Sequence, residues 1–356
     1  MPVDVLPERF ALTPNRTSLL TYWSGPIYDR NRLLFSGQTI EPNRKQEKRR
    51  IKTLAKVGFL GLGIMGAPMA RHLKEAGHEL AVWSHNDDKA KRFSSAEKAR
   101  YCSTPAQVAE NSEYIFLCVG NTAMSKEVIL GEHGLIQKAS SGTLIADCST
   151  VSPLESVRIA EALKKKGVDF LDAPCTGSKA GAEGGTLTFM IGGDRAVFER
   201  ARPYFEAMGK ALYYCGAQGM GLRAKLTQNL ILGNLLNAFN EGFVLSTKAG
   251  VDPALMLDIV SNSAARSGFV SAKAPAVFRR DFSTQFSVKW LEKDLQLMLD
   301  LGRELEVPLP HTALSQQSLR NAIAKGYGDD DICGSIRVLE ELAGVEVSQA
   351  AATAPR

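Results

Sequence analysis

Three glycines are spaced so that they could cradle a pyrophosphate. Gly61, Gly63 and Gly66 lie where an apolar, strand-like run gives way to a helical pattern. In such a turn the first glycine allows the tight bend, the second lets the backbone approach the phosphates, and the third permits close packing of helix on strand. Ile64 and Met65 would then present their N–H groups to the anion. The segment predicts a dinucleotide site, with a structural glycine-rich turn as the alternative.

A lysine and an asparagine share one face of a predicted helix. Lys225 and Asn229 are four residues apart and have leucines on either side. An amine held among apolar neighbours and beside an amide could donate a proton to an oxygen that is becoming negatively charged. An exposed helical lysine is the alternative, and for an isolated lysine it would be the better interpretation.

A short polar run follows one of the expected strands. Ser149 and Thr150 come directly after Asp147 and Cys148, at an end of the sheet where α/β proteins form their ligand crevice. Thr150 is therefore a candidate neighbour of a nicotinamide ring. The next two residues, Ser and Pro, equally suit the N-cap and first turn of a helix, and the two interpretations are compatible.

A second loop leaves the same edge of the expected sheet. Thr176, Gly177 and Ser178 belong to a glycine-rich run that extends to residue 185. Its backbone N–H groups would form a row of donors that suits a carboxylate. A flexible surface loop is the alternative.

The residues after the second expected strand bear on the choice of dinucleotide. Enzymes that use NAD place an acidic side chain there to bind the adenine ribose, but here the position is Ser84, followed by His85 and Asn86. Hydroxyl, imidazole and amide groups could meet a 2′-phosphate without charge repulsion. This favours NADP over NAD, although Asp87 and Asp88 could rotate inward.

The elements that must position these residues form two groups. From residue 57 short apolar runs alternate with helical patterns, which is typical of an α/β fold with a Rossmann-type doubly wound sheet. The expected strands are 57–60, 80–83, 114–119, 143–147, 169–172, 186–191 and 211–214. After Gly221 the strand pattern ends, and an all-α region is expected, with helices at 222–249, 253–263, 288–305, 315–325 and 333–343.

Four segments follow from this organisation: a basic, disordered extension over 1–56, a dinucleotide-binding Rossmann domain over 57–218, an all-helical substrate and dimerisation domain over 219–345, and a disordered tail over 346–356. The extension holds 11 Lys and Arg against 5 Asp and Glu, whereas the whole chain has a net charge of +5. The rest is therefore nearly neutral, which argues against nucleic-acid binding. Acidic residues within the extension count against a transit peptide.

The cysteines and the hydropathy favour a cytoplasmic protein. Six cysteines lie far apart without a Cys-x-x-Cys pair, which is typical of reduced thiols and predicts neither a disulfide framework nor a metal site. No apolar run has the length of a membrane span, and the N-terminus lacks a hydrophobic signal core. We expect no membrane association.

Together these segments resemble the β-hydroxyacid dehydrogenases, which include 3-hydroxyisobutyrate dehydrogenases, tartronate semialdehyde reductases and glyoxylate/succinic semialdehyde reductases. The resemblance covers about residues 57–343. Its motifs are, in order, Gly-Leu-Gly-Ile-Met-Gly at 61–66, Asp-Cys-Ser-Thr at 147–150, Asp-Ala-Pro-Cys-Thr-Gly-Ser at 172–178, Lys225 with Asn229, and Lys293-Asp294 with Phe286.

The resemblance implies a Rossmann domain, a helical domain that dimerises, and an active site between them. It implies that Lys225 is the catalytic lysine, Asn229 its partner at the substrate, and 176–178 the loop that binds the substrate carboxylate. It also makes Thr150 and Lys293 cofactor contacts, and Phe286 and Asp294 pocket residues. The chain departs from the family at 175–178, at Gln228 and at 84–86, where Val-Ser-Gly-Gly, Asn and Asn-Arg-Thr are common.

The resulting expectation is NADPH-dependent reduction of a small carboxylated aldehyde, such as glyoxylate or succinic semialdehyde, to the hydroxyacid by a homodimer or homotetramer. Lys225 would be the general acid. The alternatives are an NAD-dependent dehydrogenase of the 3-hydroxyisobutyrate or tartronate semialdehyde type, an imine reductase on the same fold, and a binding module without activity. Imine reductases usually lack the lysine, and a binding module would be expected to lose the lysine or the glycine turn.

Overall fold

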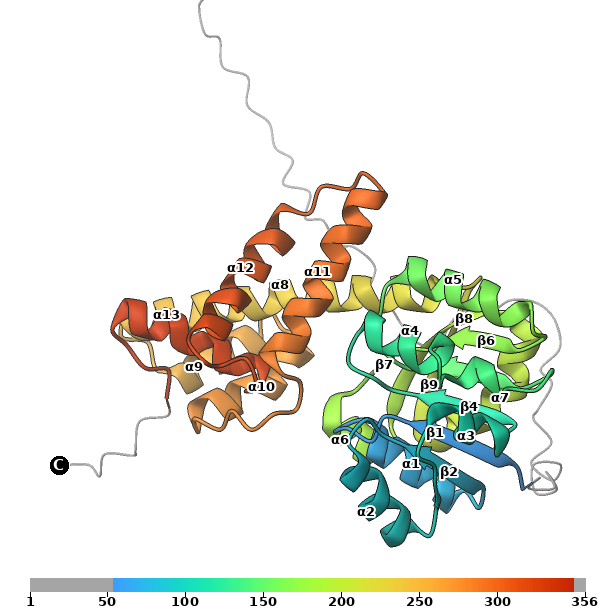
Figure 1. Ribbon diagram of the computed structural model, residues 1–356. Helices are drawn as coiled ribbons and strands as arrows, with labels where there is room; N and C mark the ends of the chain where they lie inside the picture. Colours follow the sequence, from blue (N-terminus) through green and yellow to red (C-terminus); the bar gives the residue numbers. More distant parts are fainter. Residues whose placement is uncertain (1–53, 349–356) are drawn as a thin grey trace, which may run out of the picture. The chain divides into compact units, whose positions relative to one another are not determined.

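The computed structural model describes residues 54–348 (Figure 1). The predicted extension over 1–56 and tail over 346–356 lie, but for a few residues, outside the described residues. No helix within the described range has both the length and the apolar character needed to cross a membrane.

The first half of the described chain forms one sheet in the order β3-β2-β1-β4-β5-β6-β8-β7, with β9 also paired to β8. Strands β1 to β6 run parallel, whereas β8 is antiparallel to β6 and β7 and parallel to β9. The strands are β1 (Lys56–Leu60), β2 (Glu79–Trp83), β3 (Arg100–Tyr101), β4 (Tyr114–Leu117), β5 (Leu144–Asp147), β6 (Asp169–Asp172), β7 (Cys175–Thr176), β8 (Leu187–Gly193) and β9 (Gly209–Gly216).

Helices cover both faces of this sheet because successive strand residues point to opposite sides. Phe116 of β4 packs into the same core as Phe205 of α7, whereas its neighbours Ile115 and Leu117 join Ile159 of α5 in a second core. The helices of this half are α1 (Gly66–Glu75), α2 (Asp87–Glu97), α3 (Pro105–Glu110), α4 (Thr122–Leu130), α5 (Pro153–Lys164), α6 (Ser178–Glu183) and α7 (Arg195–Met208), with the 3₁₀ turn η2 (Leu135–Gln137).

The second half is helical and is organised around one long helix, α8 (yellow in Figure 1). Leu236 and Phe243 of α8 pack with Leu291, Leu295 and Leu319 in a third apolar core. The helices are α8 (Met220–Lys248), α9 (Pro253–Ser261), α10 (Gly268–Phe278), α11 (Val288–Glu304), α12 (Pro310–Ala324) and α13 (Ile336–Ala343), with the 3₁₀ turn η3 (Ile332–Ser335). The predicted fold class, a Rossmann-type sheet followed by an all-α region, is confirmed.

Several elements differ from the sequence-based expectation. The two-residue strands β3 and β7 were not expected, because so short a run carries no periodicity. Helix α10 was also missed, and it contains Pro275, which normally counts against a helix interior. Helix α12 begins at Pro310, five residues before the expected start, and the expected helix 333–343 begins as the 3₁₀ turn η3 before α13.

Candidate active site

The glycine turn between β1 and α1 leaves open space only at its middle glycine. Gly61 has a φ of +92°, and a Cβ built there would lie 2.2 Å from the carbonyl oxygen of Cys118. A Cβ on Gly66 would lie 1.8 Å from the carbonyl oxygen of Gly61, whereas one on Gly63 would meet nothing within 4 Å. Among the described residues no side chain caps the start of α1. Uncapped N–H groups beside an open cradle fit the pyrophosphate of a dinucleotide.

The end of β2 carries a serine where NAD enzymes place an acidic side chain, and the next carboxylates, Asp87 and exposed Asp88, lie in the first turn of α2. Ser84 is 5% exposed, and its hydroxyl accepts a hydrogen bond from the Asn86 backbone N at 3.4 Å, while His85 is exposed. Asp87 is held in place because it accepts a hydrogen bond from the Tyr101 hydroxyl and forms a 2.6 Å ion pair with Lys91. The inward rotation considered for Asp87 would therefore break two contacts.

A buried aspartate fixes the ends of β4 and β5. Asp147 accepts hydrogen bonds from the Ser125 hydroxyl at 2.5 Å and from the Ser149 backbone N at 2.8 Å. Burial raises the pKa of Asp147, and both of these hydrogen bonds act in the opposite direction. The Ser149 hydroxyl in turn accepts a hydrogen bond from the Val119 backbone N at 2.8 Å. Thr150 follows directly, so this network holds its backbone at the carboxyl edge of the sheet.

The expected carboxylate loop is a sharp turn between β7 and α6. Cys175 and Thr176 pair with β8, after which Gly177 takes a φ of +133° and Ser178 a φ of +54°. The first of these angles strongly favours glycine, because a Cβ would clash there. Burial raises the pKa of the Cys175 thiol to about 11. The Lys225 ammonium is close enough to Cys175 for its charge to oppose that rise. The loop and the lysine therefore belong to one neighbourhood.

A second buried aspartate ties this loop to α8. Asp172, the last residue of β6, is fully buried and accepts hydrogen bonds from the backbone N of Gly219 at 2.7 Å and of Leu222 at 2.8 Å. The Gln218 side chain donates a third at 2.9 Å. Burial raises the pKa of Asp172 to about 7, and the backbone hydrogen bonds oppose that rise. Asp172 thereby caps the helix that carries Lys225.

Lys225 is a buried amine on the first turns of α8. Only 6% of the residue is exposed, and its Nζ donates a hydrogen bond to Gln228 Oε1 at 3.2 Å. Burial lowers the pKa of Lys225, while the charges of Asp294 and Cys175 raise it and that of Lys293 lowers it further. A buried amine with a lowered pKa is a better proton donor than an ordinary surface lysine.

A polar chain runs beside Lys225 from α8 through α11 to the sheet. Asn229 donates a hydrogen bond to Asp294 Oδ2 at 2.7 Å, and Asp294 Oδ1 forms a 2.8 Å ion pair with Lys293. Lys293 Nζ also donates to the Thr150 carbonyl oxygen at 2.5 Å. Asp294 Oδ1 is buried and has, among the described residues, no hydrogen bond beside its ion pair with Lys293, so it can accept one more from a bound molecule.

The structure brings several of the predicted site residues together, but it gives the Lys225 amine another amide neighbour. The amide beside the Lys225 amine is Gln228, whereas Asn229, expected to be that partner, is engaged by Asp294. Phe286 is half-buried against the helical core. Ile64, 49% exposed, and Met65 lie at the glycine turn.

No role at the site was assigned from the sequence to Gln228 or to the two buried aspartates, although each lies in or beside a recognised motif. Asp147 and Asp172 each open one of the recognised motifs and each end a strand, and a carboxylate at the end of a buried strand was the available signal. Across the part of the chain that the structure describes, no group of three or more His, Cys, Asp or Glu side chains is arranged to hold a metal ion.

Two family models together match most of the chain. Residues 56–216 match the NAD binding domain of 6-phosphogluconate dehydrogenase, and residues 219–339 match the NAD-binding domain of NADP-dependent 3-hydroxyisobutyrate dehydrogenase. Both halves of the described fold thus correspond to parts of nicotinamide-dependent dehydrogenases.

Named relatives agree with these matches. The chain is 37% identical to 2-(hydroxymethyl)glutarate dehydrogenase of Eubacterium barkeri, over 82% of this chain and 97% of that protein. It is 34% identical to the chloroplastic glyoxylate/succinic semialdehyde reductase 2 of Arabidopsis thaliana, over 87% of this chain and 85% of the relative. The solved structure of Mycobacterium tuberculosis 3-hydroxyisobutyrate dehydrogenase superposes with a TM-score of 0.74 at 27% identity, covering 80% of this chain and 99% of that one. The chain belongs to the β-hydroxyacid dehydrogenase family and is an NAD(P)-dependent oxidoreductase that acts on CH–OH groups.

Proposed function

We propose that this protein uses NADPH to reduce a small aldehyde that carries a carboxylate, such as glyoxylate or succinic semialdehyde, to the corresponding hydroxyacid. The observation that carries the proposal is the buried Lys225 amine, which lies among Gln228, Cys175 and the Asn229–Asp294–Lys293 chain. The glyoxylate/succinic semialdehyde reductase among its relatives supports the choice of substrate class.

The reduced nicotinamide supplies the hydride when it is bound. Lys225, as the ammonium, donates a proton to the aldehyde oxygen as negative charge develops there. Its burial favours this transfer in two ways, because the lowered pKa makes it a stronger acid and because the product is a neutral amine that a dry site tolerates. A positioned proton donor contributes roughly 10²- to 10⁴-fold to the rate. Gln228 Oε1 accepts a hydrogen bond from the amine and so orients it.

The substrate would be held at both ends. The backbone at Thr176, Gly177 and Ser178 would bind the carboxylate, because this turn has no acidic side chain. The turn directly follows Cys175, which lies near the Lys225 amine. Asp294 Oδ1, whose contact among the described residues is the ion pair with Lys293, would accept a hydrogen bond from the hydroxyl of the hydroxyacid product. Phe286 would form an apolar wall, and Lys293 and Thr150 would contact the nicotinamide end of the cofactor.

NADP is the proposed cofactor because the residue at the end of β2 is a serine and the nearest carboxylate after it, that of Asp87, is already engaged. Ser84 and exposed His85 occupy the position where NAD enzymes place an acid, and Asp87 is already engaged by Tyr101 and Lys91. Replacing Ser84 by Asp should shift the preference toward NADH. Titration of both reduced cofactors by fluorescence tests this, and a variant that still prefers NADPH as strongly as the wild type would contradict it.

A steady-state screen tests the function as a whole. NADPH and NADH would each be assayed against glyoxylate, succinic semialdehyde, tartronate semialdehyde and methylmalonate semialdehyde, with cyclic imines as the comparison class. We expect the highest kcat/KM with NADPH and one of the first two aldehydes. Turnover of imines alone would favour an imine reductase, and NADH with methylmalonate or tartronate semialdehyde would favour the NAD-dependent alternative.

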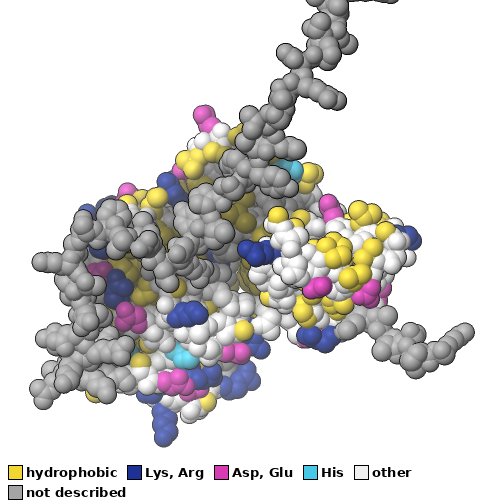
Figure 2. Space-filling model, turned by 180° about the vertical axis from the view of Figure 1, so that it is seen from behind, with side chains coloured by type: hydrophobic (Ala, Val, Ile, Leu, Met, Phe, Trp, Pro, Cys, Tyr) yellow, Lys and Arg dark blue, Asp and Glu magenta, His cyan; other side chains and the backbone are white. Residues whose placement is uncertain are grey.

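We further propose that the protein assembles as a homodimer or homotetramer. Helix α8 lines an open groove of about 490 Å³ whose walls are Ala224, Thr227, Gln228, Ile231, Leu232 and Leu235. Figure 2 shows that hydrophobic side chains also gather among charged ones on the face that it draws. Gln228 belongs both to this groove and to the Lys225 site, so a second copy seated there would also shield the amine from water. Light scattering after gel filtration would give twice or four times the 38.6 kDa chain mass, whereas a single chain mass would contradict the proposal.

We also propose that the protein is located in the cytoplasm. All six cysteines are free thiols, as is typical of proteins in a reducing compartment. Fractionation of cells that produce the tagged full chain tests the location.

A further inference from the structure

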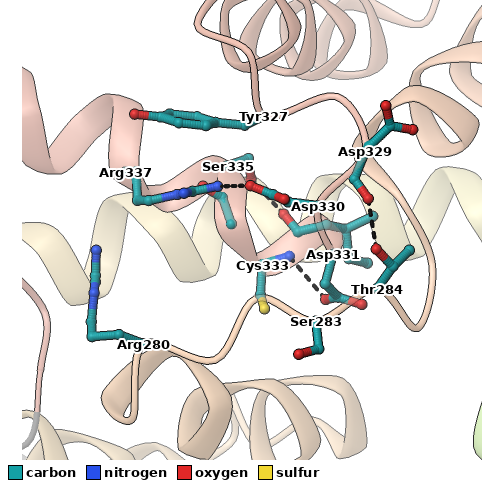
Figure 3. Close-up of polar contacts among 12 residues, drawn as sticks. Arg280, Ser283, Thr284, Tyr327, Asp329, Asp330, Asp331, Cys333, Ser335 and Arg337 are labelled. Carbon is teal, nitrogen blue, oxygen red and sulfur yellow. Dashed lines mark hydrogen bonds and ion pairs between the residues drawn. The ribbon is translucent and has the colours of Figure 1, made fainter.

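A carboxylate from the end of the chain holds the loop that carries Phe286. Asp331 lies just before η3 and is 2% exposed. Its Oδ2 accepts hydrogen bonds from the backbone N of Gln285 at 3.0 Å and of Phe286 at 3.1 Å, across 46 and 45 residues of sequence. Figure 3 shows Asp331 directed into this cluster between Cys333 and Ser283. One oxygen of the Asp331 carboxylate therefore binds the backbone of the loop that carries Phe286.

The second oxygen of Asp331 is satisfied equally well. Oδ1 accepts hydrogen bonds from Lys273 Nζ at 2.7 Å and from the Cys333 backbone N at 3.2 Å. An ionised carboxylate offers about four lone-pair sites, and here four donors fill them. Burying a carboxylate is costly unless its oxygens are paired. The loop and the carboxylate thus hold each other in one arrangement.

We call the four hydrogen bonds of the Asp331 carboxylate the Asp331 clamp. Backbone hydrogen bonds extend it to the start of α11. Asp331 N donates to the Phe282 carbonyl oxygen at 3.0 Å, and Ile332 N donates to that of Phe286 at 2.9 Å. Val288 N, in the first turn of α11, donates to the Asp330 carbonyl oxygen at 3.0 Å. Phe286 and the N-terminus of α11 are therefore fixed on the same segment, five to eight residues before Lys293 and Asp294.

Two arginines stack on Phe282, an aromatic residue of the same loop. The Arg337 guanidinium lies 3.6 Å from the ring centroid of Tyr327 and 4.5 Å from that of Phe282, and it pairs with Asp330 (Figure 3). Arg280 covers Phe282 as well, at 4.9 Å. Arg337 and Arg280 thus both pack against Phe282, in the loop whose backbone Asp331 binds.

We propose that Asp331 is a positioning residue of the active site, which places Phe286 and the start of α11 against the aldehyde without touching the substrate itself. The proposal rests on the proposed function, because Phe286, Lys293 and Asp294 are assigned to the pocket there. It predicts an effect on substrate binding that is separate from the cofactor turn at Gly61 to Gly66.

The test compares Asp331→Asn with Asp329→Asn in the full chain. The Asn variant keeps the shape of the side chain but turns an NH₂ group toward donors. Asp329 is two residues away, 84% exposed at its side chain and paired only with exposed Lys289, so its variant is the matched control. We expect the KM for the best aldehyde of the screen to rise about tenfold in Asp331→Asn, the Kd for NADPH to change less than about threefold, and the control to match the wild type.

A double-mutant cycle shows whether Asp331 acts through Phe286. In a Phe286→Ala background the Asp331→Asn change should raise the KM by less than about twofold, because the side chain that it positions is gone. A full tenfold rise in that background, or a wild-type KM in folded Asp331→Asn, would overturn the proposal.

Hydrogen exchange gives a readout that does not depend on catalysis. Amides of the peptide covering 282–289 should exchange at least about tenfold faster in Asp331→Asn than in the wild type, and unchanged exchange would overturn the proposal that Asp331 holds this loop.

The exchange measurement also separates this proposal from the proposed function. If the wild type reduces none of the aldehydes, the proposed function fails, but the exchange rates still show whether Asp331 holds the loop. Thr284→Val, which removes only the 2.6 Å hydrogen bond to the Asp329 carbonyl oxygen, serves if Asp331→Asn does not fold. It should raise the KM about threefold, and a wild-type KM would then overturn the proposal.

Discussion

Gly63 and Gly66 stand three residues apart in one turn, and the structure predicts opposite outcomes when each receives the same methyl group. On Gly66 the added Cβ would lie 1.8 Å from the Gly61 carbonyl oxygen. Ordinary contact begins at 3.4 Å, so strand and helix would have to separate by about 1.6 Å. Overpacking of this kind costs about 3 kcal/mol of unfolding free energy, which for a chain of this size lowers the Tm by roughly 4–5 °C.

On Gly63 the added Cβ meets nothing within 4 Å, so Gly63→Ala should leave the Tm within about 1 °C of the wild type. The methyl group would instead occupy the space that a pyrophosphate needs. Loss of one charge-assisted hydrogen bond, about 2 kcal/mol, corresponds to a roughly 30-fold weaker Kd for NADPH. Calorimetry and fluorescence titration of the two variants test the pair. The reasoning is refuted if Gly63→Ala binds NADPH normally, or if Gly66→Ala melts with the wild type.

Two further perturbations test the buried aspartate and the long helix. The raised pKa of Asp172, about 7 against 3.8, means that the folded protein holds this proton more tightly than the unfolded chain, so its contribution to stability falls as the pH rises from about 4 to about 7. Urea unfolding across this range should show that Asp172→Asn gains stability relative to the wild type as the pH rises, whereas Asp88→Asn, at an exposed carboxylate of α2, should show no such trend; parallel curves for Asp172→Asn would contradict the assignment. Gly242→Ala in the interior of α8, where an added Cβ meets nothing within 4 Å, should raise the free energy of unfolding by about 1 kcal/mol, and a loss of stability would show that this stretch of α8 is packed more tightly than the structure indicates.

Much of the fold follows from local pattern because the sheet is built from runs that are apolar on both faces. The strand expected at 169–172 was placed without error, and the first strand starts one residue earlier than expected. Ser152 caps α5 and Pro153 opens it, as the sequence predicted. Such features depend on a few neighbouring residues and can therefore be read without knowledge of the rest of the chain.

The missing parts depend on contacts between distant residues. Strand β7 exists because Cys175 and Thr176 pair with β8, and nothing within two residues can signal that pairing. Asp331 reaches backbone groups 45 and 46 residues away, and Asp172 reaches Leu222 across 50. The expectation that Lys225 would have Asn229 beside it came from helical spacing alone, which could not include the competing carboxylate of Asp294.

The most direct test of the account is the turnover of Lys225→Met with saturating NADPH and the best aldehyde, measured beside Lys248→Met, an exposed lysine at the far end of the same helix. The account predicts that kcat falls at least about 100-fold in Lys225→Met while the Kd for NADPH stays within about threefold of the wild type, and that Lys248→Met is unaffected. A kcat near the wild-type value in a Lys225→Met protein that still binds NADPH would contradict the central claim that this buried amine is the proton donor.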